Sequence, residues 1–317
     1  AYMGIVDVLL RADKLLKKIA LCKKDIQKVK PDVVILVDYS GFNLKIAEFV
    51  KKNIPGLKVF YYISPKVWAW NTSRAYTIKK LVDRMFVILP FEKVFYKNFD
   101  YEVDYVGNPS MDEVTSFVPD PDFRKKNNLS DKPIIAVLPG SRRGEVEHML
   151  HFMVSILPGF REYQFVVAGV SNLDKKYYQA FEREEIVTVI YEQTYDLLSN
   201  AHAAVVTSGT ATLETCLFEV PQVVCYATNP ITYLLAKLLV KVKFISLVNL
   251  IAGKQVVKEL IQGEFTPPNL MSELRKILED EVERNRIRND YKKVKSILGT
   301  ENAARNTARL MIQYLKQ

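Results

Sequence analysis

Two short stretches of the sequence have residue types and spacings that suit the binding of a phosphorylated ligand. "LPGSRRGEVE" (138–147) places Gly140, Ser141 and Arg142 directly before an expected helix, and "TSGTATLE" (207–214) again places small residues before a helix. Glycine lets the backbone approach a ligand, helix N-termini offer free N–H groups, and arginine pairs with phosphate oxygens in bidentate fashion. Together the two stretches predict a nucleotide site.

The second stretch supplies the more detailed expectation for this site. Ser208, Gly209 and Thr210 are expected to present backbone and hydroxyl donors to a diphosphate, and Glu214, about one turn into the helix, is expected to take two ribose hydroxyls. The alternative for either stretch alone is ordinary helix capping, with the arginines solvated and Glu214 favouring the helix dipole.

A third stretch, "VDYSGFNLKIAEF" (37–49), has a carboxylate where a buried strand is expected to end. In a doubly wound sheet, ligands bind beyond the carboxyl ends of the strands. We therefore expect Asp38 to face the cleft between two domains, with low solvent exposure and a raised pKa, as a general base. The alternative is a strand-end aspartate that holds a loop by backbone hydrogen bonds.

Both tryptophans of the chain lie in "YYISPKVWAWNTSR" (61–74), two positions apart. Alternate residues of an extended segment point to one side, so Trp68 and Trp70 are expected to lie on one face. That face is predicted to line a cavity for a sugar or an acyl chain, together with Asn43 and Ser64. Plain core packing of both indoles is the alternative.

The elements that position these residues follow from eight apolar runs separated by helix-length segments. Continuous Val/Ile runs of this kind indicate parallel strands buried on both faces, and hence a doubly wound α/β architecture. The runs are 32–38, 59–64, 84–89, 134–140, 164–169, 187–192, 203–209 and 222–228.

A chain of 317 residues exceeds the size of a single hydrophobic core, so two domains are expected. The polar, proline-containing segment 108–133 is the predicted linker. The expected boundaries are 1–112 for a first Rossmann-like domain and 113–285 for a second one. Residues 286–317 are expected to form a helical segment that packs back on the first domain, and 269–317 is expected to be helical throughout.

Charge and composition limit the classes of partner. Forty-five Lys and Arg against 36 Asp and Glu leave a net charge of +9, which favours a phosphorylated substrate, an anionic membrane surface or nucleic acid. The basic residues are dispersed and form no recognition motif, so nucleic acid is not expected. The three cysteines and three histidines lack metal-ligand spacing, so neither a metal nor another cofactor is expected.

The first helical pattern raises the question of a membrane. In "MGIVDVLLRADKLLKKIALCKK" (3–24), an apolar stripe is bordered by lysines, as in an interfacial helix at an anionic bilayer. Packing on the sheet is equally consistent with the pattern, and "ITYLLAKLLVKVKF" (231–244) is a second candidate for docking. The predicted docking residues are Val6, Leu9, Leu10, Leu16, Lys17 and Lys18.

The chain begins with Ala1 inside this helical pattern, where a doubly wound half normally opens with a strand. We therefore expect the first βαβ unit to be absent from this sequence. No run reaches the ~18 apolar residues of a membrane-spanning helix.

Seven motifs in order make the chain resemble the lipid-A-disaccharide synthases, glycosyltransferases of the lipid A pathway in Gram-negative bacteria. They are "VDYSGFN", "SPKVWAWNTSR", "LPFEKVFY", "VGNP", "LPGSRRGEVE", "TSGTATLE" and "SLVNLIAGKQVVKELIQ". The resemblance implies a GT-B fold with two Rossmann-like domains facing across a cleft, in which 1–112 faces the acceptor and the membrane and 113–285 binds the UDP-sugar. It also implies transfer of 2,3-diacylglucosamine from UDP-2,3-diacylglucosamine to the 6-hydroxyl of 2,3-diacylglucosamine 1-phosphate, with release of UDP and without a metal.

The resemblance also implies roles for individual residues. Asp38 would deprotonate the acceptor hydroxyl for an inverting attack, and Arg142 would meet the departing diphosphate together with Ser141 and the backbone of 208–211, which includes Ala211. Asn249 would make a further nucleotide contact and Arg74 would meet the acceptor phosphate, although a solvated arginine fits equally well. The chain departs from the family at Val248, often proline there, and at Asn108, commonly histidine.

Two other functions fit parts of the sequence. A related GT-B transferase that adds N-acetylglucosamine to a lipid-linked peptidoglycan precursor would share the fold and the UDP turns, but "SPKVWAW" and "VDYSGFN" argue against it. A catalytically inactive, membrane-binding homologue is the other, because the family's G-E-x-S-G-D turn is not in this sequence. The expected location is the cytoplasmic face of the inner membrane, and a homodimer is left open.

Overall fold

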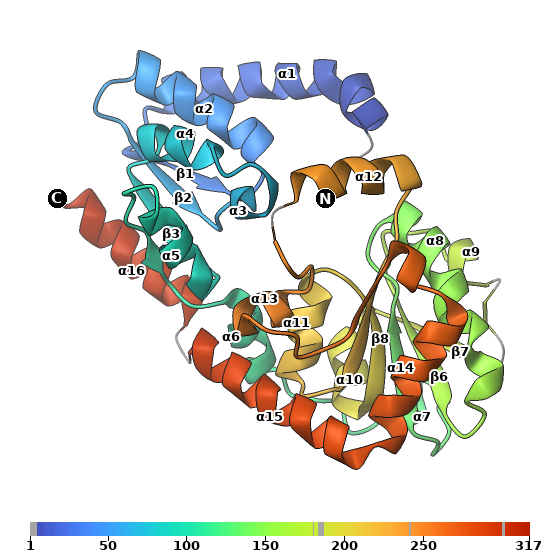
Figure 1. The fold of residues 1–317 in the computed structure, drawn as a ribbon. Coiled ribbons are helices and arrows are strands. Elements are labelled where there is room, and N and C mark those ends of the chain that lie inside the picture. The colour runs from blue at the N-terminus through green and yellow to red at the C-terminus, as the bar shows by residue number, and fades with distance from the viewer. Residues whose placement is uncertain (1–4, 180, 183–186, 241, 300–301) are drawn as a thin grey trace. The chain divides into compact units, whose positions relative to one another are not determined.

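The computed structural model describes residues 5–179, 181–182, 187–240, 242–299 and 302–317. Contacts within the chain divide it into two compact units, each built around its own parallel sheet (Figure 1). Unit 1 comprises Ala1–Pro109, Leu235–Val242 and Thr300–Gln317, and unit 2 comprises Ser110–Leu234 and Lys243–Gly299. The predicted α/β class with two parallel sheets is confirmed, and the sheet of unit 2 is doubly wound.

Unit 1 has a four-stranded sheet in the order β1-β2-β3-β4, with all neighbours parallel. Val33 pairs with Lys58, Phe60 with Arg84, and Phe86 with Asp104. The strands are β1 Val33–Val37, β2 Lys58–Tyr62, β3 Arg84–Val87 and β4 Asp104–Tyr105; the helices are α1 Ile5–Val29, α2 Ser40–Asn53, α3 Val67–Trp70, α4 Arg74–Leu81, α5 Pro90–Lys97 and α16 Ala303–Leu315.

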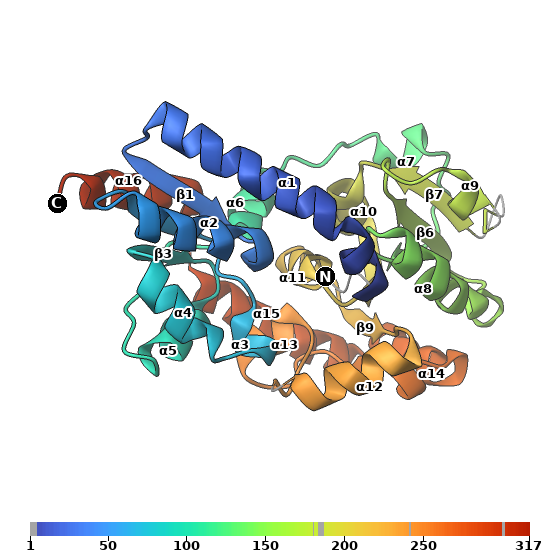
Figure 2. The same ribbon diagram turned by 90° about the horizontal axis from the view of Figure 1, so that it is seen from above.

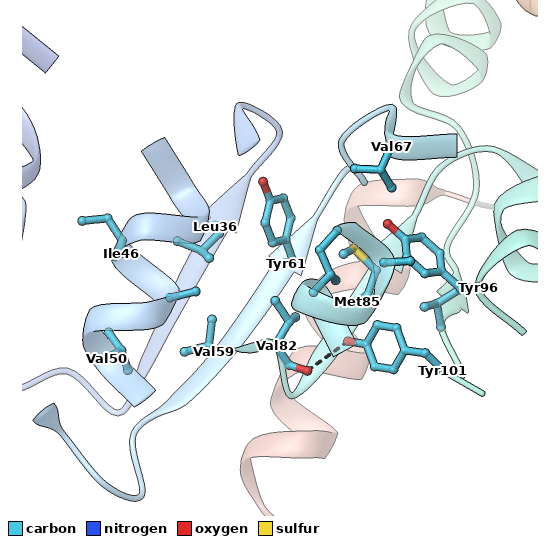
Figure 3. Packing of buried hydrophobic residues seen from close by; sticks show 14 of the residues in the cluster. Leu36, Ile46, Val50, Val59, Tyr61, Val67, Val82, Met85, Tyr96 and Tyr101 are labelled. Carbon is cyan, nitrogen blue, oxygen red and sulfur yellow. Dashed lines mark hydrogen bonds between the residues drawn. The ribbon is translucent and has the colours of Figure 1, made fainter. Parts of the chain in front are cut away.

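The alternation of side chains along these strands assigns each face of the sheet to different helices. Leu36, Val59, Tyr61 and Met85 point to the face covered by α1, α2, α4 and α5, and Figure 3 shows this core, in which the Tyr101 hydroxyl donates to the Val82 carbonyl at 3.0 Å. Figure 2 shows α1 lying beside α2.

The opposite face is covered over its middle strands by α16. Phe60, Phe86 and Val106 pack there against Met311. Ile35 and Val37 of β1 point to the same face but keep 48% and 50% of their surface exposed. Strand β1, which ends next to the predicted base, is therefore only half covered by the described residues.

Unit 2 has a six-stranded parallel sheet in the order β10-β9-β8-β5-β6-β7. The chain builds β5, β6 and β7 outward in one direction and then returns to the other side of β5 for β8, β9 and β10. This reversal places a topological switch point between β5 and β8, the position where doubly wound sheets bind ligands. The strands are β5 Ile134–Leu138, β6 Gln164–Gly169, β7 Val187–Tyr191, β8 Ala201–Thr207, β9 Gln222–Tyr226 and β10 Glu259–Ile261.

Helices of unit 2 cover both faces of this sheet. Leu197 and Leu198 of α10 pack on Ile134 and Ala136, whereas α14 contacts α8 and the strands β8 and β9. The helices from the end of unit 1 onward are α6 Pro109–Ser116, α7 Phe123–Lys126, α8 Arg143–Ser155, η1 Leu157–Gly159, α9 Lys176–Gln179, α10 Thr194–Asn200, α11 Thr210–Leu217, α12 Pro230–Leu239, α13 Leu247–Ala252, η2 Gln262–Glu264, α14 Pro267–Glu279 and α15 Glu281–Leu298.

All eight predicted strands are present, and the short strands β4 and β10 were not predicted. The segment 108–133 contains α6 and α7, so it is not an irregular linker throughout. The prediction of continuous helix over 269–317 is wrong, because Asp280 and Asn302 start new helices by accepting hydrogen bonds from the N–H groups of Glu283 and Arg305. The expected segment 286–317 is thereby divided between α15 in unit 2 and α16 in unit 1.

Candidate functional site

Asp38 lies in a tight turn directly after β1. Its φ of +46° is in the left-handed region, which aspartate tolerates better than most residues. The Asn43 amide donates to the carbonyls of Val37 and Asp38 at 2.8 and 2.9 Å, and the Tyr61 hydroxyl also donates to the Asp38 carbonyl. The backbone of the predicted base is thus held by its neighbours, and its carboxylate takes no part in these bonds.

The expectation of low solvent exposure for Asp38 is wrong within the part of the chain that the structure describes. The residue is exposed. The physical reason is that β1 is an edge strand with only β2 beside it among the described residues.

Asn43 and Ser64 were predicted to line a cavity, but both are buried and form hydrogen bonds within the protein. Asn43 uses both N–H groups of its amide on the turn at Asp38. Ser64 is 4% exposed, and its hydroxyl lies 2.8 Å from the Tyr96 hydroxyl. Both residues therefore position the strand ends rather than offer a surface to a ligand.

The two tryptophans do not share a face. Residues 67–70 form the short helix α3 rather than an extended segment, and residues two apart on a helix point to nearly opposite sides. Trp68 is 7% exposed, packs edge-to-face on Phe91, and donates from Nε1 to Glu92 at 3.0 Å. Trp70 is 39% exposed, so core packing is correct for Trp68, and only Trp70 remains available to a ligand.

Arg74 lies beside Trp70 at the start of α4. Its guanidinium is stacked 5.0 Å from the Trp70 ring and contacts the Ser40 hydroxyl at 3.4 Å. Ser40 follows Asp38 by two residues, so a cation and an exposed indole lie close to the turn that carries the predicted base. This grouping fits an acceptor with a phosphate and an apolar body.

Glu92 is a buried carboxyl group that sequence reasoning missed. It is 2% exposed and accepts hydrogen bonds from Trp68 Nε1 and from the Leu89 N–H. Burial raises its pKa to about 7, although these hydrogen bonds and the charge of Lys66 act in the opposite direction. The motif "LPFEKVFY" was the available signal, since glutamate three residues after a helix N-cap, here Leu89, suits a helix start.

In unit 2 the two predicted phosphate turns lie side by side. They follow β5 and β8, which are adjacent strands with Leu138 paired to Val206. The N-termini of α8 and α11 therefore meet at the switch point of the sheet, and the positive ends of two helices favour an anion there. This juxtaposition is the main geometric support for a diphosphate site.

The N–H groups of the turn before α8 are already hydrogen-bonded to Glu145, a residue in the first turn of that helix. Glu145 accepts from the N–H groups of Ser141 and Arg142 at 3.3 and 3.4 Å, and from Arg142 Nη1 at 2.5 Å. Gly140 has a φ of +107°, and a Cβ there would lie 2.7 Å from the Glu145 carboxylate. The positive φ favours glycine, a Cβ would also press on the Glu145 side chain, and a bound diphosphate would have to replace Glu145 on these donors.

The turn before α11 is more open. Among the described residues, no side chain caps the N-terminus of α11, whose first N–H groups have no acceptor within the helix. Gly209, Thr210 and Ala211 provide this backbone. Ser208 is already engaged, because its N–H donates to the Cys225 carbonyl and its hydroxyl donates to the Ile245 carbonyl, both at 3.0 Å. Its predicted donor role is therefore not retained.

Thr207, the last residue of β8, was not predicted to take part. Its hydroxyl is buried and has no hydrogen-bond partner among the residues that the structure describes. A buried hydroxyl without a partner calls for a further polar group, such as a water molecule or a ligand atom, at this strand end.

Glu214 lies in the second turn of α11 and is half-buried. Burial raises the pKa of its carboxyl group, and a hydrogen bond from the Tyr195 hydroxyl at 3.3 Å opposes that rise. Tyr195 lies in the first turn of α10, and it is a second residue of this site that sequence reasoning missed. The pair joins α10 and α11 near the carboxyl edge of the sheet.

Asn249 is fully buried and is committed to the protein. Its Nδ2 donates to the Val257 carbonyl and to Glu259, and its Oδ1 accepts from the N–H groups of Val256 and Val257. These four bonds use the whole hydrogen-bonding capacity of the amide. A direct side-chain contact with a nucleotide is therefore not retained, and Asn249 instead orders the start of β10.

The predicted docking residues on α1 are only partly described. The side chains of Val6, Leu9 and Leu10 lie outside the described part of the chain, whereas Leu16, Lys17 and Lys18 are exposed. Ile19 and Ile26 of the same helix are buried in the core of unit 1. The second half of α1 thus packs on the protein along one side and leaves Leu16 outside.

Helix α12, the second docking candidate, has Leu234, Leu238 and Leu239 exposed by 61%, 77% and 53%. None of the helices described is both long and apolar enough to cross a membrane.

Surface hollows and metal-ligand clusters do not add to the site. Two hollows of unit 2, of about 610 and 470 Å³, contain none of the predicted site residues. Over the described ranges, no group of three or more His, Cys, Asp or Glu residues is placed to hold a metal ion.

Comparisons with solved structures show the fold. The S. aureus MnaA–UDP co-structure is 14% identical and superposes with a TM-score of 0.68, covering 96% of this chain and 82% of that one. The Neisseria meningitidis UDP-GlcNAc 2-epimerase bound to UDP-GlcNAc is 13% identical with a TM-score of 0.66, covering 94% and 81%. The shared architecture is GT-B, as predicted.

Comparisons with protein families show the relationship. The family model described as lipid-A-disaccharide synthetase matches residues 1–313. The lipid-A-disaccharide synthase of Syntrophus aciditrophicus is 39% identical over 100% of this chain and 84% of its own length, and that of Myxococcus xanthus is 38% identical over 99% and 83%. The chain therefore belongs to the lipid-A-disaccharide synthetase family.

Proposed function

We propose that this glycosyltransferase moves 2,3-diacylglucosamine from UDP-2,3-diacylglucosamine to the 6-hydroxyl of 2,3-diacylglucosamine 1-phosphate. The products are the β-1,6-linked disaccharide 1-phosphate and UDP. Family membership over residues 1–313 supports the synthesis of lipid A disaccharide. The geometric observation that carries the proposal is the meeting of the α8 and α11 N-termini at the switch point between β5 and β8.

The proposed mechanism is a single inverting displacement. Asp38 accepts the proton of the acceptor 6-hydroxyl while that oxygen attacks the anomeric carbon, and the bond to the UDP oxygen breaks with its electron pair. Negative charge then grows on the diphosphate. In this proposal Arg142, Ser141 and the N–H groups of 209–211 stabilise that charge, as preorganised donors stabilise developing charge in other enzymes.

Before the diphosphate binds, Arg142 forms an ion pair with Glu145. Its guanidinium is 2.5 Å from Glu145, and the two side chains are 53% and 33% exposed, so the diphosphate competes with a partly solvated carboxylate rather than with a buried one. An exposed pair of this kind contributes little to stability, about 0–1 kcal/mol, and exchanges partners at low cost.

The test is acceptor-dependent release of UDP from the two proposed substrates in detergent, with EDTA present. We expect turnover that needs both substrates and persists in EDTA, because the proposed charge stabilisation uses side chains and helix ends. Turnover that stops in EDTA and returns with a divalent metal would refute the metal-free mechanism. A folded protein that releases no UDP would instead support the inactive, membrane-binding homologue.

We also propose that the protein works at an anionic membrane surface, on the cytoplasmic face of the inner membrane. Both proposed substrates carry acyl chains, the net charge is +9, and α12 exposes Leu234 and Leu238 one turn apart. An apolar helix face with nearby lysines suits an interfacial helix. A homodimer stays a prediction.

Serine at both Leu234 and Leu238 should weaken binding to phosphatidylglycerol vesicles at least about tenfold, since a buried leucine contributes about 1.5–3 kcal/mol. Vesicle flotation measures the partition. Val118→Ser is the matched control, because Val118 is 84% exposed but lies outside any helix. Equal losses in the two proteins would remove α12 from membrane docking.

A further inference from the structure

Tyr195 is held in a fixed orientation by aromatic neighbours in unit 2. Its ring lies edge-on to Phe117 with 5.4 Å between centroids, and 5.1 Å from the ring of Phe218. Phe117 and Phe218 also contact each other, with centroids 5.9 Å apart. Three mutually packed rings leave the tyrosine few rotamers, so the direction of its hydroxyl is set by packing.

The hydroxyl points to the carboxylate of Glu214. The donor and acceptor are 3.3 Å apart, and Glu214 is a turn into the helix whose N-terminus faces the switch point. A glutamate side chain has several rotamers, and it can receive two adjacent hydroxyls only when both oxygens are correctly aimed. A hydrogen bond from a fixed donor selects one of those rotamers.

We propose that Tyr195 is a positioning residue for nucleotide recognition: its hydroxyl holds the Glu214 carboxylate in the orientation that receives the ribose hydroxyls of UDP. This inference rests on the proposed function, in which Glu214 is the ribose ligand. It adds a residue from α10, nineteen positions earlier in the chain, to a site otherwise built from the turns after β5 and β8.

Substitution of Tyr195 by phenylalanine distinguishes the role of the hydroxyl from that of the ring. Tyr195→Phe keeps the contacts with Phe117 and Phe218 and removes only the donor, so the fold is expected to persist. The affinity for UDP should fall about tenfold, because the carboxylate loses its fixed partner. The affinity for 2′-deoxy-UDP should fall less, since that nucleotide cannot offer both hydroxyls.

The pH dependence of binding provides a second readout. The Tyr195 hydrogen bond lowers the Glu214 pKa against the effect of burial, so its removal should raise that pKa further. The acidic limb of UDP binding should then move to higher pH. The other charged group that acts on Tyr195 is Glu113 of α6, and it is unchanged in the variant.

Isothermal titration with UDP and with 2′-deoxy-UDP, between about pH 5 and pH 8, tests the inference on wild type, Tyr195→Phe, Glu214→Gln and the double variant. We expect Tyr195→Phe to weaken UDP binding in the wild-type background and to have no further effect in Glu214→Gln, as two members of one interaction should. Tyr163→Phe and Glu219→Gln are the matched controls, and both should bind UDP as wild type does.

The outcomes separate the inference from the proposed function. A wild type that does not bind UDP would overturn both. Normal UDP binding by wild type together with unchanged affinity and pH profile in Tyr195→Phe would overturn the role of Tyr195 alone. Equal losses from Tyr195→Phe with and without Glu214 would also overturn it, because the tyrosine would then act elsewhere.

Discussion

Asparagine in place of Asp38 should lower turnover by at least about a hundredfold, and by up to about ten-thousandfold, the usual range for loss of a general base. The amide has nearly the shape of the carboxylate but cannot accept the proton of the acceptor hydroxyl. The affinity for UDP should stay within about twofold of wild type, because no predicted diphosphate or ribose ligand is changed.

The turn that carries residue 38 should survive this substitution. Asn43 and Tyr61 donate to the backbone carbonyls of the turn rather than to the Asp38 carboxylate, so these bonds remain. Asparagine also tolerates a positive φ such as the +46° found here. A loss of activity can therefore be read as a loss of chemistry rather than of structure.

The matched control for the base is Asp32→Asn. Asp32 is also exposed and lies just before the other end of β1, away from the carboxyl edge of the sheet. Initial rates of UDP release at saturating concentrations of both substrates measure the effect. Equal rates for Asp38→Asn and Asp32→Asn would exclude Asp38 as the base.

The stability of unit 1 should fall as pH rises through the range in which Glu92 ionises. Its pKa is raised to about 7 in the folded protein, against an ordinary value of 4.5. Below both values the group is protonated in either state and has no effect. Between them the unfolded chain releases its proton first, so the free energy of unfolding drops by about 3 kcal/mol by the time pH passes 7.

Trp68 gives a local probe of this change. The chain has two tryptophans, so Trp70→Phe leaves Trp68, which donates a hydrogen bond to Glu92, as the sole indole emitter. Its fluorescence should titrate with a midpoint near the Glu92 pKa of about 7. Urea unfolding followed at this tryptophan between about pH 5 and pH 8 measures the stability of unit 1 itself.

Glutamine at position 92 should abolish both the titration and this share of the pH dependence, since the amide does not ionise. Glu48→Gln is the control, because Glu48 is an exposed residue of α2 and should leave both signals as they are. An unchanged midpoint in Glu92→Gln would show that another group is responsible.

Local patterns were enough to predict the eight longer strands, the glycine-containing turns after β5 and β8, and the family. Continuous apolar runs identify strands covered on both sides, and Gly140 reports a backbone position with a φ of +107° that other residues would resist. The short strands β4 and β10 were not predicted, because segments of two and three residues are too short to show a hydrophobic periodicity.

The partners of buried polar groups were decided by tertiary structure. Asn249 was assigned to the nucleotide, but β10 brings Glu259 and the backbone of 256–257 to its amide. Trp68 and Trp70 were assigned to one face, but α3 turns the first toward Glu92 and the second toward solvent.

The difference has one physical reason. Apolar periodicity and glycine positions reflect constraints within a few residues, which any fold containing the segment must satisfy. A polar side chain can form a hydrogen bond with any complementary group within about 3 Å. Which group lies at that distance is decided only by the packing of segments that are distant in the sequence. Tyr195 beside Glu214 is such a pair, and it became visible only when α10 and α11 were placed together.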